Sequence, residues 1–163
     1  MDLAAVRAEL SKLVGQPAWK VFRTHGSMFF LEIGQKLNAS YRSSDGTIRE
    51  YQHGEWHFLI ECAFWRFETV NETMIGSEDA QVDIDEKFAT LNLGVIKVAQ
   101  INAPSNDLLI EFETGLRLKT FSAMVKADYN DWNLYCPDDY CWVADSGGRL
   151  DRRYINEQPG NSK

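Results

Sequence analysis

The spacing of hydrophobic residues changes once along this chain, from the period of a helix to the period of a strand. Within residues 2–13, four apolar side chains recur every three or four positions: Leu3, Val6, Leu10 and Leu13. This spacing predicts an amphipathic helix that lies on the domain, begun by Asp2 and stopped by Gly15 and Pro17. Beyond it the period falls to about two, which is typical of β-strands.

Alternation of apolar and polar residues predicts strands over most of the remaining chain. Five segments have the composition of strands: residues 18–24, 27–33, 55–67, 95–101 and 107–113. The polar stretch NASYRSSDG, residues 38–46, predicts a loop. LLIEFETGLRLKTF predicts a hairpin, because Gly115 can adopt the positive φ of a tight turn, and WNLYC and YCWVA predict a second hairpin around Pro137. Acidic residues favour a short helix at about 83–91.

These elements predict an α+β fold of a single domain. We expect about seven to nine strands in a mainly antiparallel, strongly curved or barrel-like sheet, with the N-terminal helix and the second short helix packed on it. No sequence repeat divides the chain. Residues 1–145 should form the domain and residues 146–163 a polar tail that is mobile or orders only on a partner. With four basic and two acidic residues this tail is locally basic.

Composition and net charge indicate which kinds of partner the protein can bind and in which compartment we expect it. The chain is 44% hydrophobic with 12% aromatic residues, and its 17 basic and 24 acidic residues give a net charge of −7. This balance opposes nucleic-acid binding and suits solubility or a partner with a basic surface. No apolar run approaches the ~18 residues that cross a bilayer, and no secretory start is seen, so we expect no membrane association and a cytoplasmic location. Three cysteines fit reduced cytosolic thiols.

HGEWHFLIECAFWRF, residues 53–67, contains the most suggestive local cluster of metal-binding residue types. A zinc protease requires its glutamate directly after the first histidine of a helix, whereas here Gly54 intervenes before Glu55. On a straight strand His53 and His57 share a face but stand about 13 Å apart, four steps of ~3.3 Å, which is too far for one ion. We therefore predict that the two histidines share no ligand.

We predict instead that alternate residues of this stretch form one buried apolar row on a single strand: Trp56, Phe58, Ile60, Cys62 and Phe64. Cys62 would fill the core, because it would lie among these apolar side chains and not in the electropositive surroundings that a thiolate requires. His57, Glu61 and Ala63 would point to the other face of the strand.

The remaining candidates for chemistry are incomplete. Cys136 and Cys141 stand across a turn, where they could be neighbours, but no second Cys or His pair completes a zinc-ribbon spacing. DYNDWNLYCPDD has Asn133 where a calcium loop of the EF-hand type requires glycine. A cluster of acids could bind a divalent ion or act in pairs as the acid and base of a glycosidase, but a solvated helix start is the simpler account: Glu78, Asp79, Asp83, Asp85 and Glu86. With no phosphate loop, nucleophile elbow or kinase motif, we predict no catalytic residue, metal ligand or cofactor.

Aromatic residues are concentrated near the second predicted hairpin: Tyr129, Trp132, Tyr135, Tyr140 and Trp142. Aromatic side chains that alternate with acids on hairpin strands commonly form a core. Tyr and Trp close to a turn also anchor protein interfaces. We keep these five as candidate interface residues, with the core as the alternative.

Three segments, WHFLIECAFWRFE, DLLIEFETGLRLKTF and DWNLYCPDD, occur in an order that resembles small uncharacterised bacterial proteins. In those proteins a Trp-headed apolar strand precedes an Asp-Leu strand, a Gly hairpin and a Trp strand. Some of them lie beside polymorphic toxins and are regarded as candidate immunity proteins. The resemblance covers about residues 55–142 and rests on structural residues, so it implies a bacterial inhibitor but no active-site residue.

Two hypotheses for function follow. In the first, the protein is a non-catalytic binding protein, such as an immunity-type inhibitor of a basic toxin, because the chain is acidic and lacks catalytic motifs. In the second, it binds or hydrolyses a small molecule in a pocket on the concave sheet face. Titratable groups that converge in such a pocket would favour the second hypothesis. An unclosed sheet also leaves edge strands that can pair with a copy, so we predict a homodimer.

Overall fold

The chain has an α+β fold of two helices and one antiparallel sheet. The structure, a computed structural model, describes residues 3–122, 124–126 and 129–155. In these residues the elements follow in the order α1 (Leu3–Lys12), β1 (Pro17–Arg23), β2 (Phe29–Arg42), β3 (Ile48–Ile60), β4 (Phe64–Glu68), β5 (Thr73–Gly76), α2 (Gln81–Phe88), β6 (Gly94–Asn102), β7 (Asp107–Phe112), β8 (Arg117–Phe121), β9 (Asn130–Tyr135), β10 (Tyr140–Asp145) and β11 (Leu150–Tyr154). The predicted class, the antiparallel sheet and both helices are confirmed, and the strands are more numerous than the sequence suggested.

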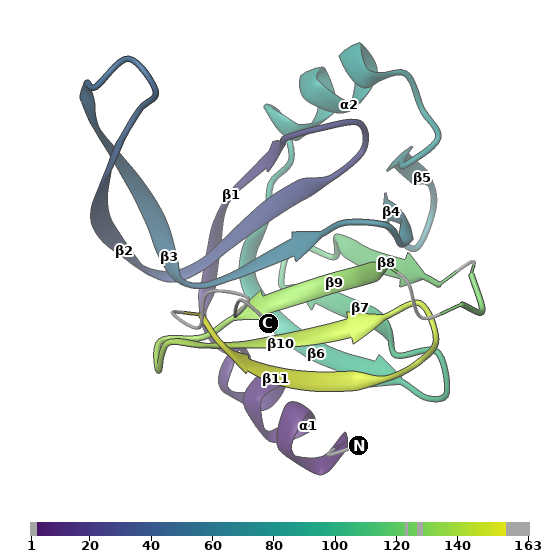
Figure 1. Cartoon of the computed structure of the whole chain (residues 1–163). Coiled ribbons are helices and arrows are strands. Elements are labelled where there is room, and N and C mark those ends of the chain that lie inside the picture. Colours follow the sequence, from purple (N-terminus) through teal and green to yellow (C-terminus); the bar gives the residue numbers. More distant parts are fainter. Residues whose placement is uncertain (1–2, 123, 127–128, 156–163) are drawn as a thin grey trace.

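Strands β1 and β6 join two halves of the sheet. The order of neighbouring strands is β11-β10-β9-β3-β2-β1-β6-β7-β8-β4-β5, and the pairs are antiparallel (Figure 1). The ladder between β1 and β6 is short: it pairs Pro17 with Val95 and Ala18 with Gly94. The sheet is neither closed nor strongly curled, so the barrel-like form expected from the sequence is not confirmed.

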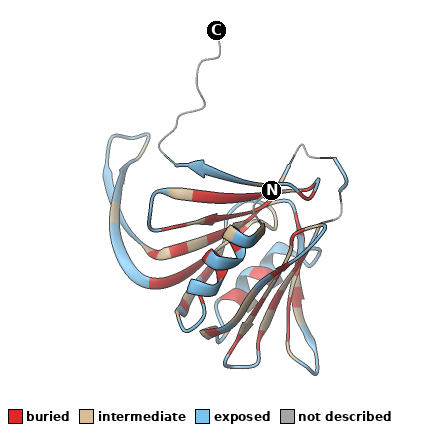
Figure 2. Cartoon of the chain, turned by 90° about the horizontal axis from the view of Figure 1, so that it is seen from below, coloured by how far each residue is buried: buried red, intermediate tan, exposed pale blue. Residues whose placement is uncertain are grey.

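The hydrophobic core lies between the two halves of the sheet. Phe29 of β2 contacts two rings of β4 in the other half, with centroid distances of 4.9 Å to Trp65 and 5.8 Å to Phe67, and packs on Phe88 of α2 at 5.3 Å. Leu10 of α1 is fully buried. Figure 2 shows buried residues in the strands of both halves and in the helices. Each such aromatic pair stabilises the fold by about 0.5–1.5 kcal/mol beyond its buried area, so these contacts hold the halves together.

Apart from the edge strand β11, the strand order is palindromic. Read from the other end of the sheet, β6–β10 take the places of β1–β5. Each set follows a helix and begins with three antiparallel strands, after which the chain crosses to the other half: β4 pairs with β8, and β9 pairs with β3. Even the irregularities correspond, since the pairing shifts between Ala18 and Lys20 in β1 and between Ile96 and Val98 in β6. The two sets are thus equivalent in topology, although the sequence shows no repeat.

Strands β2 and β3 extend well beyond the core as a two-stranded arm (Figure 1). Residues 38–46, predicted to be a loop, continue β2 as far as Arg42. The arm then turns at Ser43 and Gly46, where Ser43 N–H donates to the Thr47 carbonyl at 2.9 Å and Gly46 has a φ of 83°. Polar side chains hid this strand from the hydrophobic pattern, because both of its faces are exposed to water.

The single strand predicted for residues 55–67 is two strands in different halves of the sheet. Trp56, Phe58 and Ile60 are buried in one row, as predicted. The row then ends, since Cys62 is exposed and Phe64 is 43% exposed, so these two predictions are wrong. The chain leaves β3 after residue 60 and crosses to β8, which shifts the buried face of β4 to odd-numbered residues.

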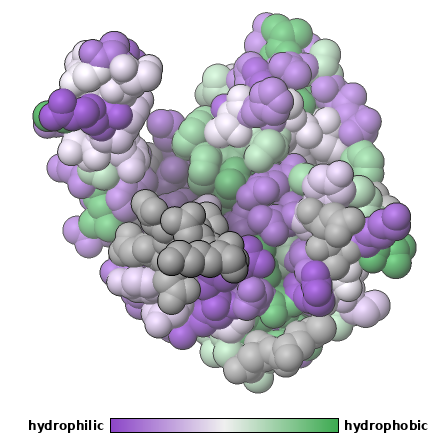
Figure 3. Space-filling view, viewed as in Figure 1, coloured by the Kyte–Doolittle hydropathy of each residue, from purple (hydrophilic) through white to green (hydrophobic). Residues whose placement is uncertain are grey.

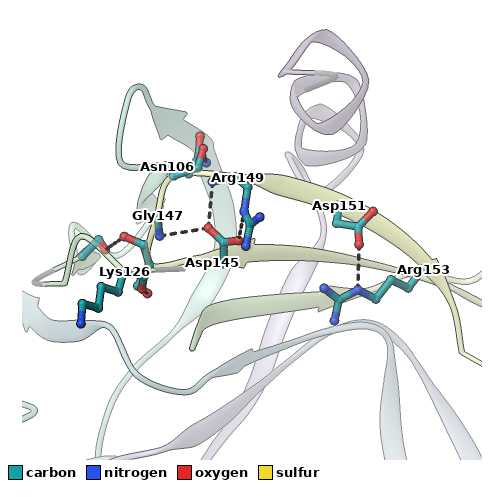
Figure 4. Close-up of polar contacts among 10 residues, drawn as sticks. Asn106, Lys126, Asp145, Gly147, Arg149, Asp151 and Arg153 are labelled. Atoms are coloured by element: carbon teal, nitrogen blue, oxygen red, sulfur yellow. Dashed lines mark hydrogen bonds and ion pairs between the residues drawn. The ribbon is translucent and has the colours of Figure 1, made fainter. Parts of the chain in front are cut away.

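Part of the segment predicted to be a polar tail is an edge strand. Residues 150–154 pair with β10, and Figure 4 shows the turn that connects the two strands. Asp145 organises this turn: one carboxylate oxygen accepts the N–H groups of Gly147 at 3.0 Å and Arg149 at 2.9 Å, and the other accepts Arg149 Nε at 2.7 Å. The rest of the predicted tail, residues 156–163, lies outside the described residues.

The two edges of the sheet differ in length and charge. Strand β5 has four residues. Strand β11 carries three exposed charged side chains, Asp151, Arg152 and Arg153. Short and charged edges oppose pairing with another chain, so they do not favour the predicted homodimer, which stays a prediction. In the described part of the chain neither helix is long and apolar enough to cross a bilayer.

Candidate functional site

Two glycines set the angle at which the arm leaves the sheet. The pairing of β2 with β3 shifts between Ile33 and Lys36, at Gly34, whose φ is 81°. On the opposite strand, a Cβ atom at Gly54 would lie 2.5 Å from the backbone N and O of Ile33. A side chain cannot occupy that space, so the close approach of the two backbones requires glycine at position 54.

A hollow of about 390 Å³ lies on the outer face of β1–β3, where the arm begins. Residues of these three strands line it: Lys20, Phe22, Phe30, Glu32, Tyr51, Gln52, His53 and His57. In the space-filling view, hydrophobic surface gathers between the projecting arm and α2 (Figure 3). The hollow faces away from the hydrophobic core, because its lining residues alternate with core residues such as Leu31 and Phe58.

Aromatic rings form the floor of the hollow. Phe22 and Phe30 are stacked with their centroids 5.5 Å apart. His57 meets the edge of Phe30 at 5.7 Å and stacks on Tyr135 of β9 at 4.5 Å. The ammonium of Lys20 lies over Phe22, 4.7 Å from the ring centroid. The floor thus offers flat apolar faces, one of which already attracts a cation.

Glu32 is the buried acid of this site. Its side chain lines the hollow although the residue is only 4% exposed, and its Oε2 atom accepts the N–H of Gly54 at 2.6 Å. None of the ion pairs between described residues includes Glu32. Burial raises the pKa of the Glu32 carboxyl, opposed by the Gly54 hydrogen bond and by positive charge on His53 and Lys20. The carboxylate therefore lacks the partner that a buried charge normally has.

The two histidines lie closer together than a straight strand allows. The rings of His53 and His57 have centroids 5.7 Å apart, and His53 Nδ1 lies 2.8 Å from the carbonyl oxygen of Gly54, where the strand bends. Burial, followed by positive charge on His53, lowers the pKa of His57 to about 4, so His57 is neutral at pH 7. Among the described residues no group of three or more His, Cys, Asp or Glu side chains could hold a metal ion. That the two histidines share no ligand stays a prediction.

The equivalent face in the other half of the sheet is built from ion pairs. Glu32 pairs across the strands with His57, and its topological counterpart Glu111 pairs with Arg117. Arg117 Nε lies 3.2 Å from one carboxylate oxygen of Glu111, and Lys97 Nζ lies 3.9 Å from the other. At the same register, the carboxylate of Glu111 forms ion pairs, whereas the carboxylate of Glu32 forms none with the described residues.

The five predicted interface residues do not lie together on one surface. Trp132 and Trp142 are buried in the core, 0% and 5% exposed, so the core alternative holds for them. Tyr140 packs on the ring of Tyr154 and on Arg152. Tyr129 is 54% exposed, which leaves it accessible to a partner. Of the five, Tyr135 alone has a described ring contact with a residue of the hollow.

The other sequence candidates lie away from the hollow. Cys136 and Cys141 are buried free thiols whose Sγ atoms lie near the backbone oxygens of Leu134 and Trp142, and burial raises both pKa values, that of Cys141 to about 12. Asp85 of the acidic cluster forms an ion pair with Arg23 at 2.6 Å. The two thiols thus lie within the core, and Asp85 links α2 to β1.

Sequence reasoning missed Glu32, Phe22 and Phe30 as site residues. One clue was present: Glu32 is a charged residue inside the apolar run MFFLEIG. A carboxylate placed in such a run is costly unless a partner or a ligand compensates it. The partner strands, which decide whether compensation exists, cannot be read from the run itself.

Comparisons of the chain with models of known protein families, with curated proteins and with solved structures found no match. The resemblance to candidate immunity proteins therefore stays untested. The function proposed below therefore rests on the geometry of the hollow.

Proposed function

We propose that this chain is a non-catalytic protein that binds a small flat ligand in the hollow between β1 and the base of the β2–β3 arm. The observation that carries the proposal is the buried carboxyl of Glu32, which has no ion pair with a described residue although its counterpart Glu111 has two. A buried acid with a perturbed pKa in a concavity is a candidate functional group. A volume of about 390 Å³, lined by aromatic rings and a few polar groups, is in the range of small-molecule sites.

The lining residues favour binding over hydrolysis. The described side chains around the hollow include no serine, threonine or cysteine that could act as a nucleophile. His57 is neutral at pH 7 and is packed between Phe30 and Tyr135, which suits a rigid wall. A non-catalytic ligand site is therefore the simpler interpretation of these residues.

The alternative function, an inhibitor of a basic toxin in a bacterial cytoplasm, rests on net charge and resemblance. The arm is the most prominent projection, but it carries Lys36, Arg42 and Arg49 against Asp45 and Glu50. It is therefore not an acidic surface that selects a basic partner. Exposed side chains such as Tyr41 and Ile48 do leave room for contact with another protein.

A fragment screen with a matched pair of variants tests the proposal. Phe30 and Leu109 occupy equivalent positions, since each stands two residues before the corresponding glutamate and both are half-buried on the outer face. Aromatic fragments at millimolar concentration should shift the NMR resonances of the wild type and of Leu109→Ala, and Phe30→Ala should lose these shifts. The proposal fails if no fragment binds, or if Phe30→Ala binds as well as Leu109→Ala.

A further inference from the structure

We propose that the ligand of this hollow is a cation: a flat aromatic molecule that carries an ammonium, amidinium or guanidinium group and pairs this group with Glu32. The inference rests on the proposed function and adds the chemical class of the ligand. Two faces of the sheet share one topology but differ in the residue that stands opposite the glutamate.

Different residues stand opposite the two glutamates. Glu111 faces Arg117 across the strands, and the guanidinium reaches the carboxylate at 3.2 Å. Glu32 faces His57 at the same register, and the imidazole is neutral at pH 7 because burial lowers its pKa to about 4. The fold therefore provides a place for a cation beside each glutamate. Arg117 occupies this place beside Glu111, whereas the neutral His57 stands there beside Glu32.

One lysine, Lys20, lines the hollow. Lys20 stands opposite Glu32 in the pairing of β1 with β2, yet no ion pair joins them among the described residues. Its ammonium lies instead over Phe22, 4.7 Å from the ring centroid. Lys20 is exposed, so its flexible side chain can move into water when a ligand arrives. Its position also shows that this ring face attracts positive charge.

The shape of the hollow suits a planar ligand. The stacked rings of Phe22 and Phe30 present an apolar floor, and Tyr51 of the arm, 48% exposed, stands at the side of the hollow. A planar ligand can cover the floor while its charged end reaches the buried carboxylate. Charge-assisted hydrogen bonds in such a site are stronger than neutral ones, so the charge should decide which of several similar rings binds.

Three probes of one shape and different charge test the inference: benzamidinium, benzamide and benzoate. Their dissociation constants are measured by NMR titration at pH 7.5 with the wild type, Glu32→Gln, the matched control Glu111→Gln, and Lys20→Met. Glutamine at position 32 can still accept the Gly54 N–H, and thermal melting checks that each variant is folded.

We expect benzamidinium to bind the wild type at least about tenfold more tightly than benzamide, and benzoate to bind most weakly. Glu32→Gln should remove the preference, Glu111→Gln should retain it, and Lys20→Met should strengthen benzamidinium binding, because a competing cation is gone. If benzamide binds as tightly as benzamidinium, or if Glu111→Gln loses the preference as Glu32→Gln does, the cationic ligand is wrong while the hollow remains a ligand site. If none of the three binds, both the inference and the proposed function are wrong.

Discussion

Trp65 of β4 and Trp132 of β9 make the same hydrogen bond in the two halves of the fold. Trp65 Nε1 donates to the Ser27 carbonyl at 2.8 Å, and Trp132 Nε1 donates to the Asn106 carbonyl at 2.9 Å. Each strand has crossed to the opposite half of the sheet, and each indole reaches back to the turn before the second strand of its own set. The two tryptophans therefore tie the halves together across the core at equivalent points.

Replacing either tryptophan by phenylalanine should destabilise the protein by a similar amount. Trp65→Phe and Trp132→Phe each remove one hydrogen bond, leave a carbonyl without its donor and reduce the packed volume, so we expect a loss of about 1–3 kcal/mol in the free energy of unfolding. Urea denaturation measures the free energy of unfolding of each variant. Trp19→Phe is the control, because Trp19 Nε1 is buried with no hydrogen-bond partner among the described residues, and it should cost less. A Trp132→Phe variant as stable as the wild type would contradict the equivalence.

His57 should make the folded state less stable as the pH is lowered from about 6.5 to about 4. In this window the unfolded state protonates His57 near its ordinary pKa, whereas folded His57, with a pKa of about 4, stays neutral, so the unfolded state binds more protons and gains stability. The contribution of His57 is at most about 3 kcal/mol. Urea denaturation across this pH range should show a shallower dependence for His57→Gln. The exposed His25 provides the control, and a His25→Gln variant that flattens the profile equally would oppose this account.

Alanine at Gly54 should disrupt both the arm and the hollow. The added Cβ would lie 2.5 Å from the Ile33 backbone, which is far closer than real contacts, so the strands must separate at a cost of about 1–3 kcal/mol or more. Differential scanning calorimetry should show a lowered Tm, and fragment binding should weaken. At Gly46, at the tip of the arm, nothing lies within 4 Å of an added Cβ, so Gly46→Ala should cost about 1 kcal/mol and leave binding intact. Equal binding by Gly54→Ala and the wild type would mean that the bend does not shape the site.

Cys62 should be the thiol that reacts in the folded protein. It is exposed, whereas Cys136 and Cys141 are buried. Burial and the charges of Glu61 and Asp131 raise the pKa of Cys62, so the reaction with a disulfide reagent should be slow and should accelerate as the pH rises. We expect one reactive thiol per native chain, none in Cys62→Ser, and all three cysteines to react after unfolding. Two or more thiols reacting at the same rate in the native protein would show that the core around β9 and β10 opens readily.

The sequence by itself determined the elements whose pattern is local. The helical stripe predicted α1, and Gly115, with a φ of 85°, provides the turn between β7 and β8 that its position suggested. The buried row of Trp56, Phe58 and Ile60 was also predictable. In each case, neighbouring residues decide the conformation, because the period of a helix or strand and the chemistry of a turn extend over a few positions.

The tertiary structure alone decided which strands meet. Cys62 and Phe64 left the predicted row because the chain crosses to the other half of the sheet, and the alternation pattern does not record a crossing. Likewise, Glu32 and Glu111 occupy equivalent positions in similar apolar strands, but one faces His57 and the other faces Arg117. A sequence pattern shows which face of a strand is apolar. The charge and burial of the opposite face depend on side chains that long-range pairing brings from elsewhere in the chain, which is why the hollow became visible only in the folded protein.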